Sequence, residues 1–143
     1  MRTPQAMFEL ELPHDATSAG TARRALAEWF GSHLQERELE TATLLTSELV
    51  TNAVRHGKGA ITLRASLDDD RLLIEVTDEG EGLEQMIRER NFEHVQGWGL
   101  KIVDSQSSRW GAHEGTTHVW FELERHGPRL GADKNPAGQP DEQ

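Results

Sequence analysis

Two stretches of this chain, residues 7–12 and 61–67, alternate apolar and polar side chains. Because successive side chains of a strand point to opposite faces, this alternation predicts strands with only one face buried. Between them, apolar residues recur at helical spacing. This predicts one helix from the capping residues at 15–18 to about Leu34, and another from about Arg37 to His56. Residues 71–78 are the next expected strand, and the aspartates at 68–70 turn it back on 61–67 as a hairpin.

The second half of the chain is less regular. Residues 79–96 are acidic and interrupted by glycine, with one short helical piece expected near 83–90. A helix is expected from Gly99 to Ser105, followed by a hairpin of residues 109–112 and 118–123. The order predicts an α+β fold, a two-layer sandwich of a mixed, mostly antiparallel sheet with helices on one face. Trp29, Trp110 and Trp120 are expected in its core.

Length and composition limit the number of domains and the class of protein. At 143 residues one domain is expected, and we place it at residues 6–124. Residues 125–143 have hardly an apolar side chain among their glycines, prolines and charges, which predicts a disordered tail. There is no cysteine, no apolar run long enough to span a membrane, and no secretory signal, so we expect a cytoplasmic protein. The net charge of −10 and the lack of a basic cluster argue against direct binding of nucleic acid.

Glu48 and Asn52 are the first candidate site residues. They lie four positions apart within the expected helix 37–56, so they share one face, one turn apart. Such a pair is common on the solvated side of a helix. Asn is a poor residue for a helix interior, however, and both residues border the apolar stripe. A carboxylate can take a proton and an amide oxygen can bind a hard cation, so this pair suits Mg²⁺ and phosphate chemistry.

Two glycine-containing segments follow this helix. Asp78 ends a strand and precedes Gly80 and Gly82, which is typical either of a simple turn or of a pocket. In a pocket, the carboxylate accepts a hydrogen bond from an exocyclic amine, and the glycines let the backbone approach a flat ring.

The second segment is Gly97-Trp98-Gly99-Leu100, at the start of the last expected helix. Free N–H groups at a helix start favour phosphate. Lys101 in the first turn is either a counter-charge for that phosphate or a solvated surface residue. Trp98 is either an anchor over the ligand or a packing residue.

Together the three segments resemble, in order and spacing, the nucleotide-binding domain that DNA gyrase, sensor histidine kinases and bacterial anti-sigma-factor serine kinases share, the Bergerat fold. The run from Ser47 to Gly57 resembles the N box of this family, Asp78 to Gly82 its DxGxG box, and Gly97 to Leu100 its second glycine box. The resemblance covers about residues 6–124 and is strongest to the short anti-sigma branch of serine/threonine kinases.

The resemblance implies ATP and Mg²⁺ as ligands and gives each residue a role. Asn52 would hold Mg²⁺ between the phosphates, Glu48 would be the general base for an incoming hydroxyl, and Asp78 would bind the adenine amino group. The residues that would shape the pocket or contact the nucleotide are Gly80, Gly82, Gly97, Gly99, Leu100, Lys101 and Thr117.

The resemblance also implies protein partners. A sigma factor would be sequestered, and an anti-sigma-factor antagonist would be phosphorylated on Ser or Thr. The first long helix, with Arg23 and Arg24, is either a docking surface or an ordinary solvated face. Homodimers are familiar in this family. Gln96 and Trp98 stand where basic residues are frequent, and this favours an alternative, a nucleotide-binding regulatory interaction module with little or no kinase activity.

Overall fold

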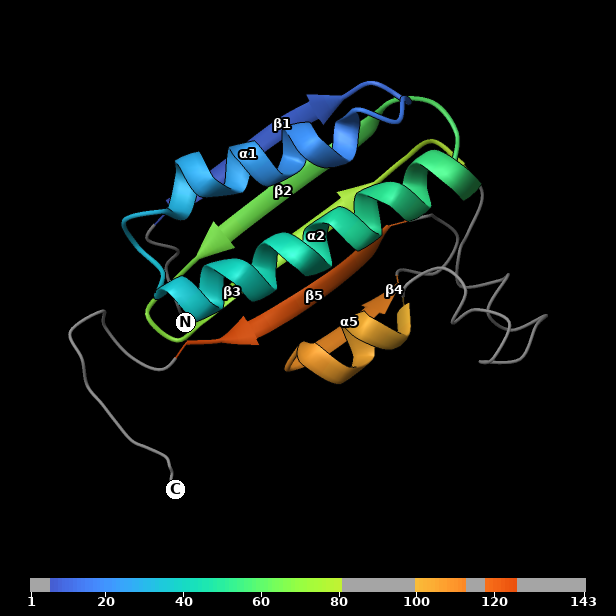
Figure 1. Ribbon diagram of the computed structural model, residues 1–143. Helices are drawn as coiled ribbons and strands as arrows, with labels where there is room; N and C mark the ends of the chain where they lie inside the picture. Colours follow the sequence, from blue (N-terminus) through green and yellow to red (C-terminus); the bar gives the residue numbers. More distant parts are fainter. Residues whose placement is uncertain (1–5, 81–99, 113–117, 126–143) are drawn as a thin grey trace.

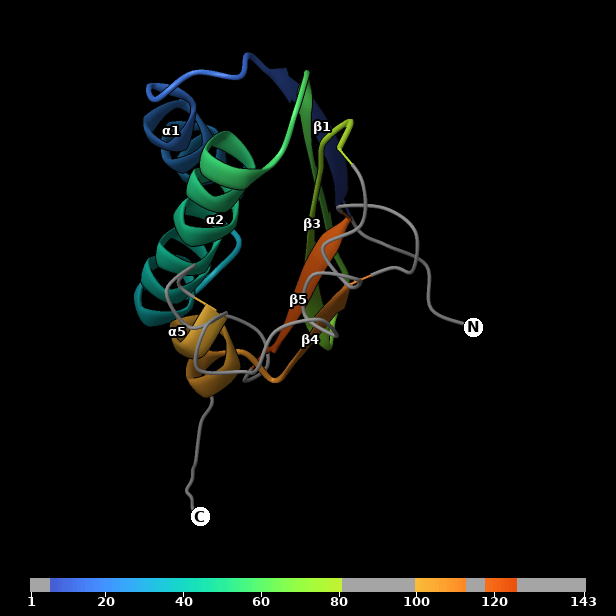
Figure 2. The same cartoon turned by 90° about the vertical axis from the view of Figure 1, so that its right-hand side faces the viewer.

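The computed structural model describes residues 6–80, 100–112 and 118–125. In chain order the elements are β1 (Ala6–Leu12), α1 (Ser18–Phe30), α2 (Glu36–His56), β2 (Ile61–Leu67), β3 (Arg71–Thr77), α5 (Leu100–Gln106), β4 (Arg109–Ala112) and β5 (Val119–Glu124). The strands form one five-stranded sheet in the order β1-β2-β3-β5-β4, and each described strand pairing is antiparallel. The described helices all lie on one face of this sheet (Figures 1 and 2). The predicted α+β sandwich is therefore confirmed.

Some sequence predictions fall outside the described residues. These are the short helix near residues 83–90 and the tail predicted at residues 125–143, of which the structure describes only Arg125. Within the described ranges, no helix is both long enough and apolar enough to cross a membrane.

The core lies between the sheet and the helices. The alternate residues Ile61, Leu63, Ala65 and Leu67 of β2 are all buried, and the buried residues of β3 and β5 continue the same face. Leu45, Leu49 and Val50 of α2 and Leu26 and Phe30 of α1 cover them. The buried alternate residues of the strands thus pack against the apolar stripes of α1 and α2, as the sequence predicts.

The first helix ends earlier than its apolar spacing predicts. The spacing predicts an end near Leu34, but α1 ends at Phe30. Gly31 donates to the carbonyl of Ala27 over 2.9 Å, and His33 and Leu34 both donate to the carbonyl of Phe30 in a turn. Leu34 is nevertheless only 2% exposed, so it fills the core from the turn. The apolar periodicity therefore predicts the burial of Leu34 correctly but predicts too long a helix.

The start of α1 depends on Asp15 just before it. Its Oδ1 accepts hydrogen bonds from the backbone N–H and the hydroxyl of Thr17, each 2.7 Å long. These two bonds, the backbone one first, lower the pKa of Asp15 below its usual value. Ser18 also donates its hydroxyl to the carbonyl of Pro13 at 2.6 Å, which fixes the chain between β1 and α1.

Of the three tryptophans expected in the core, Trp120 lies on the opposite face of the sheet. Its neighbours Val119 and Phe121 are buried under the helices, so the alternation of β5 turns Trp120 away from them. The guanidinium of Arg109 lies 5.7 Å from its ring centre, on the same face. Trp29 and Trp110, by contrast, pack against the core as expected.

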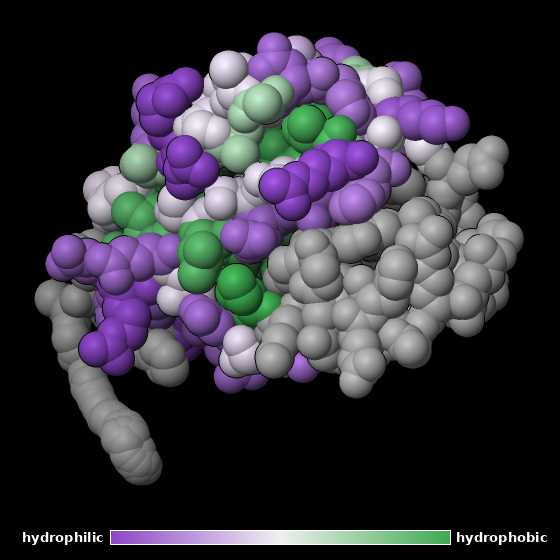
Figure 3. Space-filling view, turned by 45° about the vertical axis from the view of Figure 1, so that its right-hand side comes forward, coloured by the Kyte–Doolittle hydropathy of each residue, from purple (hydrophilic) through white to green (hydrophobic). Residues whose placement is uncertain are grey.

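Few large apolar side chains are exposed on the surface of the described residues. On the side shown in Figure 3, hydrophilic residues dominate the coloured area and apolar residues occur in small patches. Among the large apolar residues that the structure describes, Met7 and Leu44 are exposed, at 71% and 38%.

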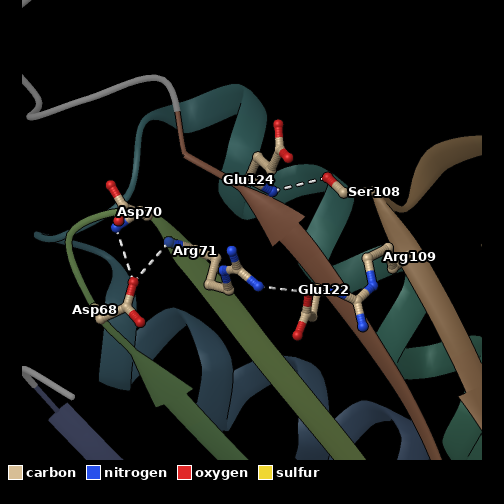
Figure 4. A network of polar contacts seen from close by, with 7 residues as sticks. All are labelled: Asp68, Asp70, Arg71, Ser108, Arg109, Glu122 and Glu124. Carbon is tan, nitrogen blue, oxygen red and sulfur yellow. Dashed lines mark hydrogen bonds and ion pairs between the residues drawn. The ribbon is translucent and has the colours of Figure 1, made fainter. Parts of the chain in front are cut away.

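A polar network closes the β2–β3 hairpin (Figure 4). Oδ1 of Asp68 accepts hydrogen bonds from the backbone N–H groups of Asp70 and Arg71, both 2.8 Å long. The Arg71 guanidinium then forms an ion pair with Glu122 of β5 at 3.1 Å. The hairpin turn and the neighbouring strand are thus joined at this end of the sheet.

Arg125 adds a second set of bonds at the same end of the sheet. Its backbone N–H donates to the carbonyl of Asp70 at 2.8 Å. Its guanidinium donates to the carbonyls of Asp68 and His33, at 2.6 and 3.0 Å. The residue after β5 is therefore fixed to both the hairpin and the α1–α2 connection.

An aromatic cluster of Phe8, Trp29 and Phe30 joins β1 to α1, and it yields a stability prediction. The Phe8 ring stacks on Trp29 at 5.0 Å and meets Phe30 edge-on at 5.4 Å. Because Phe30 is fully buried, Phe30→Ala should lower the free energy of unfolding by about 3–5 kcal/mol, as measured by denaturant unfolding. The exposed Met7→Ala on the other face of β1 is the control, with about 0.5 kcal/mol or less expected. Equal losses for both variants would contradict the prediction.

Candidate functional site

The C-terminal half of α2 carries the first two candidate residues. Glu48 is half-buried and Asn52 is 9% exposed, and they follow one another on one side of the helix. The Asn52 side-chain nitrogen is buried without a hydrogen-bond partner among the described residues. A buried amide left unpaired costs about 1–3 kcal/mol, so such a group is suited to bonding a ligand or water.

Asp78 lies just past the end of β3, and backbone groups hold its carboxylate. Oδ1 accepts a hydrogen bond of 2.7 Å from the N–H of Gly80 and a longer one of 3.3 Å from the N–H of Lys58. Lys58 belongs to the connection between α2 and β2. The carboxylate is half-buried, so it combines fixed geometry with access to a ligand.

The C-terminal end of α2 meets the end of β3 at Asp78. Gly57, the residue after α2, lies so close to the Asp78 carboxylate that a Cβ atom there would overlap it. Asn52 is five residues earlier, about 7.5 Å along the helix axis. The structure therefore brings the expected metal-binding side chain and the expected adenine-binding carboxylate to the same end of the molecule.

The other predicted site residues are described in part or not at all. Gly80 follows Asp78 as expected and donates to it. Leu100 and Lys101 begin α5, which packs beside α2, but their side chains lie outside the description. Outside the described residues altogether lie Gly82, Gly97, Gly99 and Thr117. Their roles stay predictions.

The donor set fits a magnesium nucleotide. Mg²⁺ takes oxygen ligands, which the carboxamide of Asn52 can supply. The nitrogen of this carboxamide makes no hydrogen bond to the described residues. Because a half-turn of the amide exchanges its oxygen and nitrogen, the same group can present either atom to a ligand. The half-buried Glu48 one turn away can accept a proton. Among the described residues, no group of three or more His, Cys, Asp or Glu side chains could hold a metal ion.

Sequence reasoning missed His14, which joins the β1–α1 loop to this end of α2. One ring nitrogen lies 2.8 Å from the carbonyl of Val54 and the other 3.1 Å from the carbonyl of Gly59. Because both acceptors are carbonyls, both bonds form only when both ring nitrogens carry a proton. The bond to Val54 satisfies a carbonyl in the last turn of α2 that has no partner within the helix. A histidine after a strand gives no signal of this in the sequence, because its partners are 40 and 45 residues away.

The fold and this site define a class of protein. The profile of the family described as histidine kinase-like ATPase domain matches residues 12–122. The chain therefore belongs to the histidine kinase-like ATPase domain family, and the resemblance seen in its three sequence segments is confirmed at that level. Membership implies ATP as the ligand.

The chain is also similar to individual curated proteins. The chain is 36% identical over 86 residues to the protein named anti-sigma F factor of Caldanaerobacter subterraneus subsp. tengcongensis, covering 56% of this chain and 59% of that protein. It is 36% identical over 85 residues to the anti-sigma F factor of Clostridium acetobutylicum, covering 55% and 59%. The protein of the same name from Thermoanaerobacter sp. is 35% identical over 86 residues. The matches thus span about three fifths of the length of these curated relatives.

Proposed function

We propose that this protein binds Mg-ATP between α2 and the end of β3 and acts as an anti-sigma-factor regulator with serine/threonine kinase activity. The observation that carries the proposal is the meeting of the end of α2 with Asp78, which places the Asn52 amide and the Asp78 carboxylate at one end of the fold. In the proposal the amide binds the cation and the carboxylate binds the amine. Family membership and the names of the relatives support it.

In this proposal each described residue has one task. Asn52 would hold Mg²⁺, which neutralises charge on the phosphates when bound. Asp78 accepts a hydrogen bond from the adenine amino group, with its position fixed by the N–H groups of Gly80 and Lys58. Gly82, Gly97, Gly99, Leu100, Lys101 and Thr117 complete the pocket as the family resemblance implies.

Glu48 is the proposed general base. Its carboxylate takes the proton of a Ser or Thr hydroxyl while the hydroxyl oxygen bonds to the terminal phosphorus of ATP. The bond from that phosphorus to the bridging oxygen breaks, and ADP leaves. Phosphoryl transfer of this kind depends mainly on positioning and charge stabilisation, so a sparse set of side chains is sufficient.

The proposed partners are a sigma factor, which is sequestered, and an anti-sigma-factor antagonist, which is phosphorylated. Arg23 and Arg24 are both exposed on α1, and we assign the docking surface to this helix. Two adjacent cations on a protein with a net charge of −10 would attract an acidic partner surface locally. A homodimer and a location in the cytoplasm stay predictions from the sequence.

A second candidate is a nucleotide-binding regulator without transferase activity. The neutral Gln96 and Trp98 favour it, because a basic residue there would stabilise charge on the transferred phosphate. The two candidates share the nucleotide site and differ only in the chemical step.

Calorimetric titration of the full chain with Mg-ATP tests nucleotide binding, which both candidate functions require. We expect one site with a dissociation constant between about 1 μM and 1 mM, the range of typical substrate affinities. Titration with ATP in the presence of a chelator is the control and should give weaker binding, since the phosphates then lack their counter-ion. If millimolar Mg-ATP produced no heat and no shift in thermal unfolding, both candidates would fall.

A further inference from the structure

The connection between α2 and β2, residues 57–59, lies against the residues that follow β3. Lys58 donates its N–H to Oδ1 of Asp78 at 3.3 Å, and its carbonyl accepts the N–H of Glu79 at 2.7 Å. His14 in turn binds the carbonyl of Gly59 at 3.1 Å. Three chain segments that are far apart in sequence thus hold the backbone around Asp78.

Two glycines make this close approach possible. Gly57 has φ −95° and ψ −166°, an extended conformation that any residue adopts, so its backbone does not require glycine. Position 57 requires glycine for reasons of space, because a Cβ atom there would overlap both the carboxylate carbon and Oδ2 of Asp78. Gly59 has φ +70°, and a Cβ there would overlap the Glu79 carboxylate.

Asp78 has little freedom to yield to such a contact. Its Oδ1 is held by the N–H of Gly80 at 2.7 Å as well as by Lys58. A side chain at position 57 would therefore turn the carboxylate about this held oxygen or displace it from both donors. Either movement changes where the carboxylate presents its acceptor atoms to a ligand.

From this we infer that Gly57 is a specificity-determining position, whose missing side chain sets the Asp78 carboxylate in the place where it recognises an amino-substituted purine. The inference rests on the proposed function, because it assumes that Asp78 binds the adenine amino group. Gly57 acts through Asp78 and is a positioning residue, without contact to the nucleotide.

A four-member cycle of variants tests it: the unaltered protein, Gly57→Ala, Asp78→Ala and the double variant. The first readout is thermal unfolding without nucleotide. Gly57→Ala should lower the midpoint markedly when Asp78 is present and much less in the Asp78→Ala background, where the overlapping carboxylate is gone. Such non-additivity is the signature of residues in direct contact.

The second readout is specificity. The ratio of affinities for Mg-ATP and for the magnesium complex of purine riboside triphosphate, which lacks the 6-amino group, should fall by about 10- to 100-fold in Gly57→Ala. This is the effect of one hydrogen bond to a charged group. In the Asp78→Ala background, Gly57→Ala should leave the ratio unchanged, because the amine then has no carboxylate to meet.

Gly31→Ala is the matched control. Gly31 caps α1 as Gly57 caps α2, and each donates its N–H to the carbonyl four residues earlier at 2.9 Å. A Cβ at Gly31 would lie 2.6 Å from the Ala27 oxygen, against 2.7 Å from the Ala53 oxygen for Gly57. The two variants therefore share the strain at the helix end, and only Gly57→Ala disturbs Asp78. Gly31→Ala should lower stability without changing the nucleotide ratio.

The outcomes distinguish a failure of the Gly57 inference from a failure of the proposed ATP binding. Equal effects of Gly57→Ala in both backgrounds, or a ratio altered as much by Gly31→Ala, would overturn the inference while leaving ATP binding intact. If Gly57→Ala does not fold, the double variant decides. It should fold, with a midpoint below that of Asp78→Ala by no more than Gly31→Ala lowers the midpoint of the unaltered protein, and its failure to fold would overturn the inference. Coupling in the unfolding data without any ATP binding by the unaltered protein would overturn the proposed function, and the specificity role with it.

Discussion

Asn52→Ala should weaken Mg-ATP binding by at least about 100-fold, measured by calorimetric titration. The change removes the only protein group we assign to Mg²⁺, and loss of even an indirect partner of a metal costs about 10- to 100-fold in affinity. The fold should survive, because the Asn52 side-chain nitrogen makes no hydrogen bond to the described residues that alanine would forfeit. Far-UV circular dichroism and a cooperative unfolding transition would verify this.

Thr46→Val is the control for Asn52→Ala. Thr46 lies in the same helix, is fully buried, and has a hydroxyl oxygen without a partner among the described residues. Valine keeps its shape and removes the unpaired polar atom, so stability should rise by up to about 1 kcal/mol with unchanged ATP affinity. If both variants bound Mg-ATP as the unaltered protein does, Asn52 would have no part in the site.

Glu48→Gln should preserve Mg-ATP binding and slow phosphate transfer by about 10²- to 10⁴-fold, the usual contribution of a general base. Glutamine keeps the size and hydrogen-bonding reach of the side chain but cannot accept the hydroxyl proton. The measurement is transfer of label from the terminal phosphate of ATP to a serine or threonine of a co-purified partner protein. Calorimetry on the same samples separates loss of chemistry from loss of binding.

Glu40→Gln is the control for this second substitution. Glu40 is exposed and lies two turns earlier in α2, so its loss removes the same charge from the same helix without touching the site. It should transfer phosphate at the original rate. A Glu48→Gln variant with undiminished transfer would remove Glu48 as the base. A protein that binds Mg-ATP but never transfers phosphate would leave the regulatory module as the function.

Much of the fold was predictable because local patterns and tertiary packing agree. The strand 61–67 and the helix expected from about Arg37 to His56 match β2 and α2 closely, since alternate residues of one and the apolar stripe of the other meet in the core. The aspartates at 68–70 form the expected hairpin turn, with Asp68 bonded to the N–H groups after it. The predicted length of α1 was wrong because Leu34 is buried although it lies in a turn, so its apolar side chain was counted as part of the helix.

The candidate site was predictable only in its individual residues. Glu48, Asn52 and Asp78 stand out because polar residues border an apolar stripe or end a strand. Nothing local reveals that Gly57 touches Asp78, or that His14 binds Val54 and Gly59. These contacts form between segments 21 to 45 residues apart, and they exist only once the sheet has brought the segments together. A glycine with ordinary backbone angles carries no signal of the close approach it allows.

The attachment of Arg125 has a practical consequence for the experiments above. The bonds of Arg125 fix it beside Asp70, at the start of β3, whereas Asp78 follows the end of that strand. Seven residues of strand separate the two ends by about 23 Å. A dye, affinity tag or surface linker joined directly after Arg125 would begin at the end of the domain opposite the proposed nucleotide site. The protein can therefore be immobilised from that side for binding measurements with its proposed ATP site facing the solution.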